Sequence, residues 1–291
     1  MASLKEIKSR VISVENTKKI TVARQMISSA RLRQTQVILE KTRHYNKELE
    51  RIISALINPQ DPVCNELTAS HEKEAVAIVV MSSNSGMCGA FNSRMVKELS
   101  HLPERYPGEK LLFFPVGKKI REALTRAGFT IHGNFDELAV RIDFKRAANF
   151  TDELIALFRA KKIKKADIIY YHHKSAATQL IMHEQLLPYV LPALSDSKIE
   201  DNPNSDDSLW PIFEPSQQAV FDAILPQVLR SKFYMALADN HTAEHGARLL
   251  AMQLASENAN DILEELRLNY NKIRQQNITA ELLDIVGGLF A

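Results

Sequence analysis

The stretch best suited to chemistry is residues 77–94, which read AIVVMSSNSGMCGAFNSR. An apolar run leads into a turn with two glycines and a cysteine, and a possible helix follows. Nucleotide-binding turns and the nucleophile elbows of hydrolases share this order of strand, glycine turn and helix. The stretch is therefore either an active site or a turn that serves only the fold.

The spacing of the glycines argues against a nucleotide or covalent-catalysis site. A dinucleotide fingerprint needs three glycines, and a phosphate loop needs a lysine followed by Ser or Thr. This turn has only Gly86 and Gly89, followed by Ala90 and Phe91. An elbow built on Cys88 would need a glycine in place of Ala90. We interpret the segment as a tight strand-to-helix turn, with no catalytic residue and no cofactor.

The histidines do not form a metal-ligand pattern either. His172 and His173 are adjacent at a predicted strand end, where successive side chains point to opposite faces. His241 and His245 share a helix face with Glu244, but the order of the HExxH zinc motif is missing. We expect no metal site.

The composition excludes several classes of protein. A chain of 291 residues that is 45% hydrophobic and 25% charged suits a soluble folded protein. The net charge of +2 is too small to indicate nucleic acid, and two cysteines make no disulfide framework. The first residues lack an apolar targeting segment, and no run of apolar residues is long enough to span a bilayer.

The two ends of the chain predict long helices that pack along each other. Residues 4–57 contain no proline or glycine, and their first apolar residues step by three or four, as in a coiled coil. Residues 227–286 contain no proline and one glycine, and they carry a similar stripe. The first helix would be ~80 Å long at ~1.5 Å per residue. We predict an antiparallel coiled coil of the two ends; two separate helices packed on a compact core are the alternative.

The middle of the chain predicts an α/β domain. Apolar runs at 75–81, 111–117 and 166–174 alternate with amphipathic segments at 118–129 and 150–163. This alternation indicates a parallel, doubly wound, Rossmann-like sheet. The predicted division is an N-terminal coiled-coil helix (1–58), a central α/β domain (70–194), a linker and foot segment (195–215) and a C-terminal coiled-coil helix (216–291).

The charges on the long helices suggest a protein partner. Between Asn16 and Leu39 every charged residue is basic, which favours an acidic partner surface, and the apolar stripe favours protein over nucleic acid. The last residues, IVGGLFA, are apolar and would suit a hydrophobic collar. The polar residues just before them could also be an ordinary solvated face.

Three motifs, in order along the whole chain, resemble the gamma subunits of F-type ATP synthases. They are EIKSRVISVENTKKIT (6–21), SSNSGMCGAFNS (82–93) and ENANDILEELRLNYNKIRQQNITAELLDIVGG (257–288). The resemblance implies the rotating central stalk of the complex, in which ATP chemistry takes place on the beta subunits. It implies one gamma chain inside a ring of three alpha and three beta subunits, with a foot that docks with epsilon on the membrane ring of c subunits.

The resemblance also implies how the chain reaches the membrane. Proton or sodium flow would turn the ring and the stalk, and the stalk would drive ATP synthesis on the beta subunits. The expected place is the cytoplasmic face of a bacterial cell membrane, as a peripheral protein held there only through its partners.

Carried onto this sequence, the resemblance implies contacts at three levels. The upper contacts with the beta subunits would be Arg274, Gln275, Thr279 and Glu281. The lower contacts, with acidic beta loops, would be Lys18, Lys19, Arg24, Arg31 and Arg33. The foot segment, IFEP, implies Phe213 and Glu214 as contacts with the c-ring or epsilon. Glu244, Arg248 and Met252 match the family's Glu-x-x-x-Arg-x-x-x-Met run.

The sequence departs from the family at two places. Arg24 stands where a methionine is usual, and Asn84-Ser85 replaces an Asp-Arg pair, so any salt bridge of that pair is absent. Two alternatives of another class are a coiled-coil scaffold with an inert α/β head and an α/β enzyme with helical arms. Association with ATPase subunits, or turnover by the purified chain, would discriminate among the three.

Overall fold

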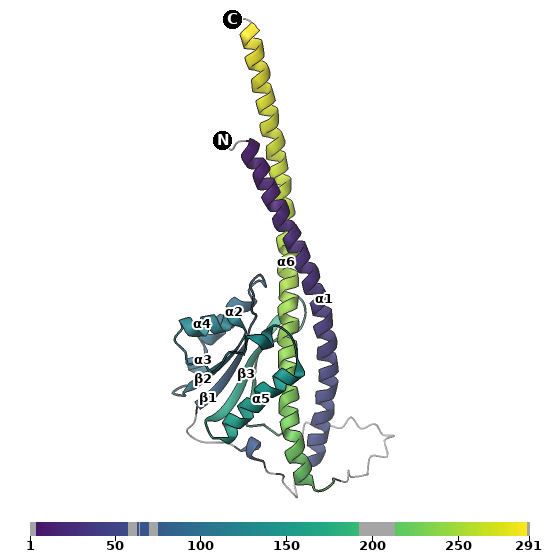
Figure 1. Cartoon of the computed structure of the whole chain (residues 1–291), viewed down its shortest axis with the longest axis vertical. Helices are drawn as coiled ribbons and strands as arrows, with labels where there is room; N and C mark the ends of the chain where they lie inside the picture. Colours follow the sequence, from purple (N-terminus) through teal and green to yellow (C-terminus); the bar gives the residue numbers. More distant parts are fainter. Residues whose placement is uncertain (1–3, 58–62, 64, 70–74, 192–212, 290–291) are drawn as a thin grey trace, which may run out of the picture.

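The computed structural model describes residues 4–57, 63, 65–69, 75–191 and 213–289, without the side chains of 284 and 287–289. It consists of a long two-helix shaft and a smaller head that packs against one side of it (Figure 1). The shaft is formed by α1 (Leu4–Leu56) and α6 (Gln217–Leu289). The head comprises residues 75–191.

The two shaft helices run antiparallel. Gln217 at the start of α6 donates a hydrogen bond of 2.6 Å to the carbonyl of Leu56 at the end of α1. Far along the shaft, Arg267 of α6 lies 2.9 Å from Glu15 of α1. The predicted antiparallel pairing of the chain ends is therefore confirmed. The helix α6 continues past the start of α1, so its last part stands alone (Figure 1).

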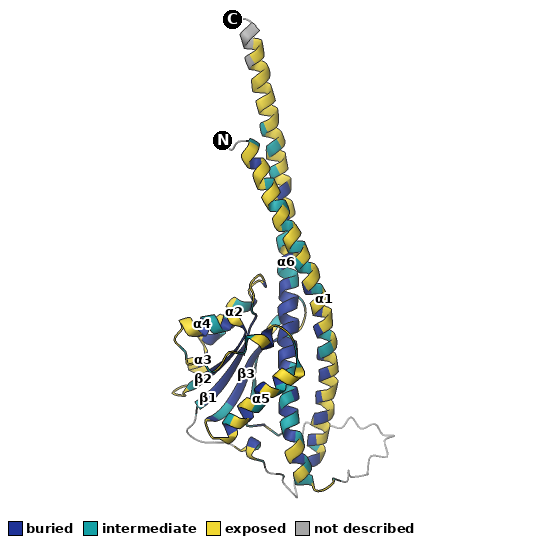
Figure 2. Cartoon of the chain, in the orientation of Figure 1, coloured by how far each residue is buried: buried dark blue, intermediate teal, exposed yellow. Residues whose placement is uncertain are grey.

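The lower half of α1 has a regular buried seam. Its buried positions alternate in steps of four and three, the repeat of a coiled coil. They are Ser28, Leu32, Thr35, Leu39, Thr42, Asn46, Leu49, Ile53 and Leu56. Asn46 Nδ2 lies 3.5 Å from the Ser231 carbonyl of α6, which favours one register. Before Ser28 only Ile7 of α1 is buried among the described residues, and the other α1 residues there are half-buried or exposed, so the upper half of the seam is more open than the lower half (Figure 2).

The head contains a four-stranded mixed sheet in the order β2-β1-β3-β4. The strands β1 (Ala75–Met81), β2 (Leu111–Val116) and β3 (Ile163–His173) are parallel, as the alternation of elements predicts. The fourth strand, β4 (Gln179–Leu187), pairs antiparallel with β3 and is absent from the sequence prediction. It forms a β-hairpin with β3, and an alternation of strands and helices predicts only parallel neighbours.

Short helices connect the strands. They are α2 (Phe91–Leu99), α3 (Leu102–Arg105), α4 (Lys118–Arg126) and α5 (Phe144–Arg159), with the 3₁₀ turn η2 (Asp136–Ala139). A further 3₁₀ turn, η1 (Glu66–Thr68), precedes β1. The helix α5 begins six residues before the predicted Phe150, because Asp143 caps it by accepting a hydrogen bond from the Arg146 amide at 3.0 Å.

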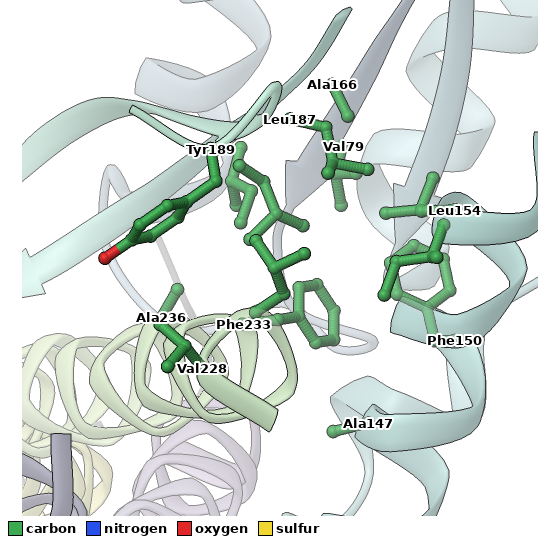
Figure 3. Close-up of a cluster of buried hydrophobic side chains, with 14 of the residues drawn as sticks. Val79, Ala147, Phe150, Leu154, Ala166, Leu187, Tyr189, Val228, Phe233 and Ala236 are labelled. Carbon is green, nitrogen blue, oxygen red and sulfur yellow. The ribbon is translucent and has the colours of Figure 1, made fainter. Parts of the chain in front are cut away.

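Alternate residues of β1 face two separate cores. Val76, Ile78 and Val80 pack with α2 and α4, whereas Ala77, Val79 and Met81 pack with α5 and α6. In the second core the rings of Phe150 (α5) and Phe233 (α6) lie 4.7 Å apart, between the sheet and the shaft (Figure 3). The shaft helix α6 is thus a layer of the head, which fixes the head to the shaft. Within the described part of the chain, no helix has both the length and the hydrophobicity needed to cross a membrane.

Candidate functional site

The turn after β1 holds Cys88 in the core rather than presenting it to a substrate. The side chain is 2% exposed, and Asn92 Nδ2 lies 3.2 Å from its sulfur. Burial raises the pKa of the Cys88 thiol, which outweighs the opposing effect of nearby Arg248. A nucleophilic cysteine needs an accessible thiolate. The structure therefore agrees with the interpretation of residues 77–94 as a turn of the fold.

The start of α4, a helix N-terminus whose amides could bind an anion, is occupied by the chain itself. The amides of Lys118, Lys119 and Ile120 donate to Asn84 Oδ1 (2.8 Å), the Ser83 carbonyl (3.1 Å) and Ser82 Oγ (3.0 Å). Phosphate binding depends on free amides at such a helix start. Here the residues after β1 accept from all three amides, so these amides at the start of α4 are not available to a phosphate.

The crevice at the carboxyl ends of the strands is filled by α6. In open α/β sheets this crevice is the usual ligand site. Asn240 Oδ1 accepts the Tyr171 amide of β3 at 3.2 Å, and His241 Nε2 lies 2.8 Å from the Leu138 carbonyl of η2. We name the buried polar residues of α6 that face the head the polar belt: Asp239, Asn240, His241, Glu244 and Arg248.

An ion pair within the polar belt reaches the glycine turn. Arg248 Nη1 lies 2.6 Å from Glu244 Oε1, and less than a tenth of either side chain is exposed. The other arm of the guanidinium donates to Ser85, at 3.0 Å to Oγ and 3.3 Å to the carbonyl. Ser85 is therefore bonded, and so is its neighbour Asn84, whose Nδ2 donates to the Asp136 carbonyl at 2.8 Å. These are the two residues at which the resemblance implied an Asp-Arg pair.

The adjacent histidines of β3 meet the polar belt at one residue. His172 Nδ1 lies 2.5 Å from Asp239 Oδ2, and the His173 amide donates to Asp239 Oδ1 at 2.8 Å. The His173 ring packs over Gly246, where an added Cβ would lie 3.2 Å from Cε1 of the ring. Within the described residues, no three His, Cys, Asp or Glu side chains group closely enough to hold a metal ion.

His245 is a buried neutral base between the shaft helices. Burial lowers its pKa to about 3, and the nearby His241, Arg248 and Arg31 act in the same direction. His245 and His241 share a helix face, as the spacing predicts, with ring centroids 6.2 Å apart. The depressed pKa keeps His245 uncharged at neutral pH beside the Arg248–Glu244 pair.

Lys18, Lys19 and Arg24 lie on the upper half of α1, and Arg31 and Arg33 lie just below Ser28. Lys18 and Lys19 line a groove of about 840 Å³ between α1 and α6, opposite Asn260 and Leu263. Arg33 lines a second hollow of about 450 Å³. Arg24 is half-buried and Arg31 is exposed. The structure places these five cations on one helix, but their contacts with partners remain a prediction.

The residues of the predicted upper contact lie on the part of α6 that extends beyond α1. Arg274, Gln275, Thr279 and Glu281 are exposed there, and Thr279 Oγ1 donates to the Gln275 carbonyl of its own helix at 2.9 Å. Large apolar side chains are also exposed, among them Leu282 (57%), Leu283 (66%) and Ile285 (62%). We call this segment, residues 274–286, the tip.

The foot segment is only partly described. Residues 192–212 lie outside the described part, so most of the predicted linker (195–215) has no structural account. Phe213 is half-buried against the larger core, and Glu214 is exposed. Of the predicted foot contacts, Glu214 has its side chain in solvent, whereas Phe213 contributes to the fold.

The sequence prediction named His241, Glu244 and Arg248 but missed Asp239 and Asn240, and it gave no buried partners for the polar belt. Residues 239–248 read DNHTAEHGAR, an unusually polar stretch within a helix that is otherwise built for packing. All of these residues are buried. This concentration of hydrogen-bonding side chains is the sequence signal that could have identified the belt, because buried polar groups need specific partners.

Comparison with known proteins gives a consistent result. Residues 3–291 match the family described as ATP synthase. The chain is 39% identical to the ATP synthase gamma chain of Phocaeicola vulgatus and 40% identical to that of Bacteroides fragilis, with 100% of both chains covered in each case.

Two solved structures share the fold at lower sequence identity. A chain of the rotor of the Euglena gracilis mitochondrial ATP synthase matches with a TM-score of 0.61 at 21% identity, over 94% of this chain and 98% of that one. A chain of the central stalk and c-ring of the Tetrahymena thermophila enzyme matches with a TM-score of 0.57 at 21% identity, over 81% and 99%.

Proposed function

The chain belongs to the gamma-chain family of ATP synthases, and from that premise we propose how its parts act in the complex. As the central-stalk gamma subunit of an F-type ATP synthase, it is a rotor component and not itself the catalyst. We propose that rotation of a c-ring, driven by protons or sodium ions, turns the shaft. The turning shaft drives ATP synthesis on the beta subunits.

The observation that carries this proposal is the exposed apolar tip on a rod of two antiparallel helices. The rod is stiffened by the buried seam below Ser28, whereas the tip leaves Leu282, Leu283 and Ile285 in solvent. Exposing such side chains is unfavourable by about 25 cal/mol per Å² of apolar surface. A collar of alpha and beta subunits would bury them and would also cover the open upper half of the shaft.

We assign the contacts by position along the shaft. Arg274, Gln275, Thr279 and Glu281 on the tip are proposed to meet the beta subunits from inside the collar. The cations Lys18, Lys19, Arg24, Arg31 and Arg33 are proposed to meet acidic loops at the lower ends of the beta subunits. Glu214 and the foot, with Phe213 beneath it, are proposed to meet the c-ring and epsilon. The complex would then lie on the cytoplasmic face of a bacterial membrane.

Reconstitution tests this function directly. The purified chain is mixed with the alpha and beta subunits of its own cell, and the mass and ATPase activity of the product are measured. We expect one gamma chain with three alpha and three beta subunits, and ATPase activity that depends on the gamma chain. A matched variant in which Leu282, Leu283 and Ile285 are changed to Ser should assemble poorly. Absence of any association would contradict the proposal.

A further inference from the structure

A short basic loop joins the end of α5 to the start of β3. Residues 159–165 read RAKKIKK, so five of the seven side chains are cationic and none is acidic. Ile163 is fully buried and pairs with Ala75 of β1, which leaves the cations around it at the surface. We name the exposed residues Lys110, Arg159, Lys161 and Lys162 the basic edge.

Only part of this charge is neutralised within the chain. Lys164 lies 2.6 Å from Glu109, and Lys165 lies 2.7 Å from Asp167. Arg159 is 3.8 Å from Glu66. Among the described residues, no carboxylate lies within ion-pair distance of Lys110, Lys161 or Lys162.

Lys161 occupies a backbone position that favours glycine. Its φ is 55°, and its amide and that of Lys162 bond to the Phe158 and Leu157 carbonyls at 2.9 and 3.0 Å. The helix α4 ends with the same pair of bonds, but there the position belongs to Gly128, with a φ of 76°. A left-handed conformation costs free energy for lysine and very little for glycine. The chain therefore accepts strain at a position where it displays a cation.

The basic edge lies at the foot end of the molecule. Lys110 and Lys161–Lys162 precede the parallel strands β2 and β3, so they share the sheet edge opposite the polar belt. Arg159 contacts Glu66, and the neighbouring Asn65 lies 2.5 Å from Asp222 in the first turns of α6. In Figure 1 the end of α5 accordingly lies toward the end of the shaft where α1 ends and α6 begins.

We propose that the basic edge contacts anionic phospholipid headgroups of the membrane around the ring on which the foot sits. This inference rests on the proposed function for the position of the foot. Protein interfaces are depleted in lysine and enriched in aromatic residues and arginine, whereas three of the four cations here are lysines. Lysines near an anionic membrane surface are attracted without fixed pairing. Such a diffuse contact steadies the head yet lets the rotor turn.

The test uses the chain assembled with alpha and beta subunits, so that the apolar tip is enclosed. The complex is floated with vesicles of phosphatidylcholine alone or mixed with phosphatidylglycerol, at low and high salt. We expect binding only to the mixed vesicles, weakened by salt. The variant Lys110→Gln/Lys161→Gln/Lys162→Gln should bind the mixed vesicles at least ~10-fold more weakly than the unchanged complex. The control Lys41→Gln/Lys97→Gln/Lys145→Gln removes as much charge from other exposed sites and should bind like the unchanged complex.

A single substitution separates strain from binding. Lys161→Gly should raise the thermal midpoint of unfolding, because it relieves the left-handed strain, and it should also weaken vesicle binding. Lys161→Arg keeps the cation and should bind vesicles like the unchanged complex. Unchanged vesicle binding by the triple variant would overturn the proposal. When epsilon subunit is added to both complexes, a variant complex that fails to bind it but still binds vesicles would also overturn the proposal, since that result assigns the edge to an acidic protein. Failure of the unchanged chain to assemble would instead overturn the proposed function.

Discussion

Arg248 Nη2 lies 3.0 Å from Ser85 Oγ, a bond that ties the middle of α6 to the turn after β1. The same guanidinium pairs with Glu244 one helical turn away, at 2.6 Å. Because both charges are almost excluded from water, neither can exchange its partner for solvent at low cost. The bond therefore makes the head and the shaft a single mechanical unit at the level of the polar belt.

Arg248→Met should destabilise the chain by about 3 kcal/mol, because it leaves the Glu244 carboxylate buried without its partner. The free energy of unfolding, measured with urea at neutral pH, tests this expectation. The double variant Arg248→Met/Glu244→Leu should recover most of the loss, since an apolar pair of similar size needs no charge partner. A double variant less stable than Arg248→Met would contradict the argument.

Gly117 is required where β2 passes into α4. Its φ is 113°, and an added Cβ would lie 2.7 Å from the carbonyl oxygen of Ser82. Both the conformation and the clash with backbone oppose a side chain, so Gly117→Ala should lower the free energy of unfolding by about 3 kcal/mol.

Gly86 supplies the matched control for that measurement. No heavy atom lies within 4 Å of a Cβ added there, and its φ is outside the left-handed region. Gly86→Ala should therefore leave the urea midpoint nearly unchanged. Equal destabilisation by the two substitutions would show that the close approach of Gly117 to Ser82 is not the cause.

His245 should make the chain less stable in acid. Its pKa is lowered to about 3 in the folded chain, chiefly by burial, against about 6.5 when unfolded. Above pH 6.5 the residue is neutral in both states. As the pH falls from 6.5 toward 3, the unfolded chain binds a proton that the folded chain does not bind, so stability is lost at up to ~1.4 kcal/mol per pH unit.

The difference between the unchanged chain and His245→Gln isolates this contribution. Unfolding is measured with urea at several values between pH 7 and pH 5, and the variant should show the shallower loss of stability. His44→Gln removes an exposed histidine of α1 and should leave the slope as it is. The same slope in all three chains would mean that His245 is not the group that titrates.

The helical ends and the three parallel strands could be predicted because their signals are local. A proline-free apolar repeat over residues 4–57 specifies a helix, and short apolar runs between amphipathic segments specify strands. The hairpin strand β4 could not be predicted in this way. Its residues are mostly half-buried, as expected of an edge strand, so they lack the apolar run that marked its neighbours.

The polar belt depends on contacts far apart in sequence, so the pattern alone could not assign its partners. Asp239 meets His172 and His173, and Arg248 meets Ser85, across separations of 66 to 163 residues. The spacing of His241 and His245 gave their shared face correctly, but only the packing of α6 on the head shows what each residue contacts. A run of polar residues in a helix that packs against a domain predicts that they have buried hydrogen-bond partners, but it does not predict which residues those partners are.

Arg24 should influence how rotation is coupled to ATP hydrolysis. It is half-buried on the upper half of α1, at a position where the family resemblance implies a methionine, and it adds a charge near the proposed path of acidic beta loops. An ion pair there, at about 1 kcal/mol, would favour one rotational position and slow departure from it by ~5-fold. Arg24→Met should therefore speed ATP hydrolysis by the assembled complex by up to ~5-fold and change the number of ions pumped per ATP hydrolysed in membrane vesicles. Lys41→Met, which removes an exposed cation lower on α1, should change nothing, and an unchanged pumping ratio in Arg24→Met would refute the coupling role.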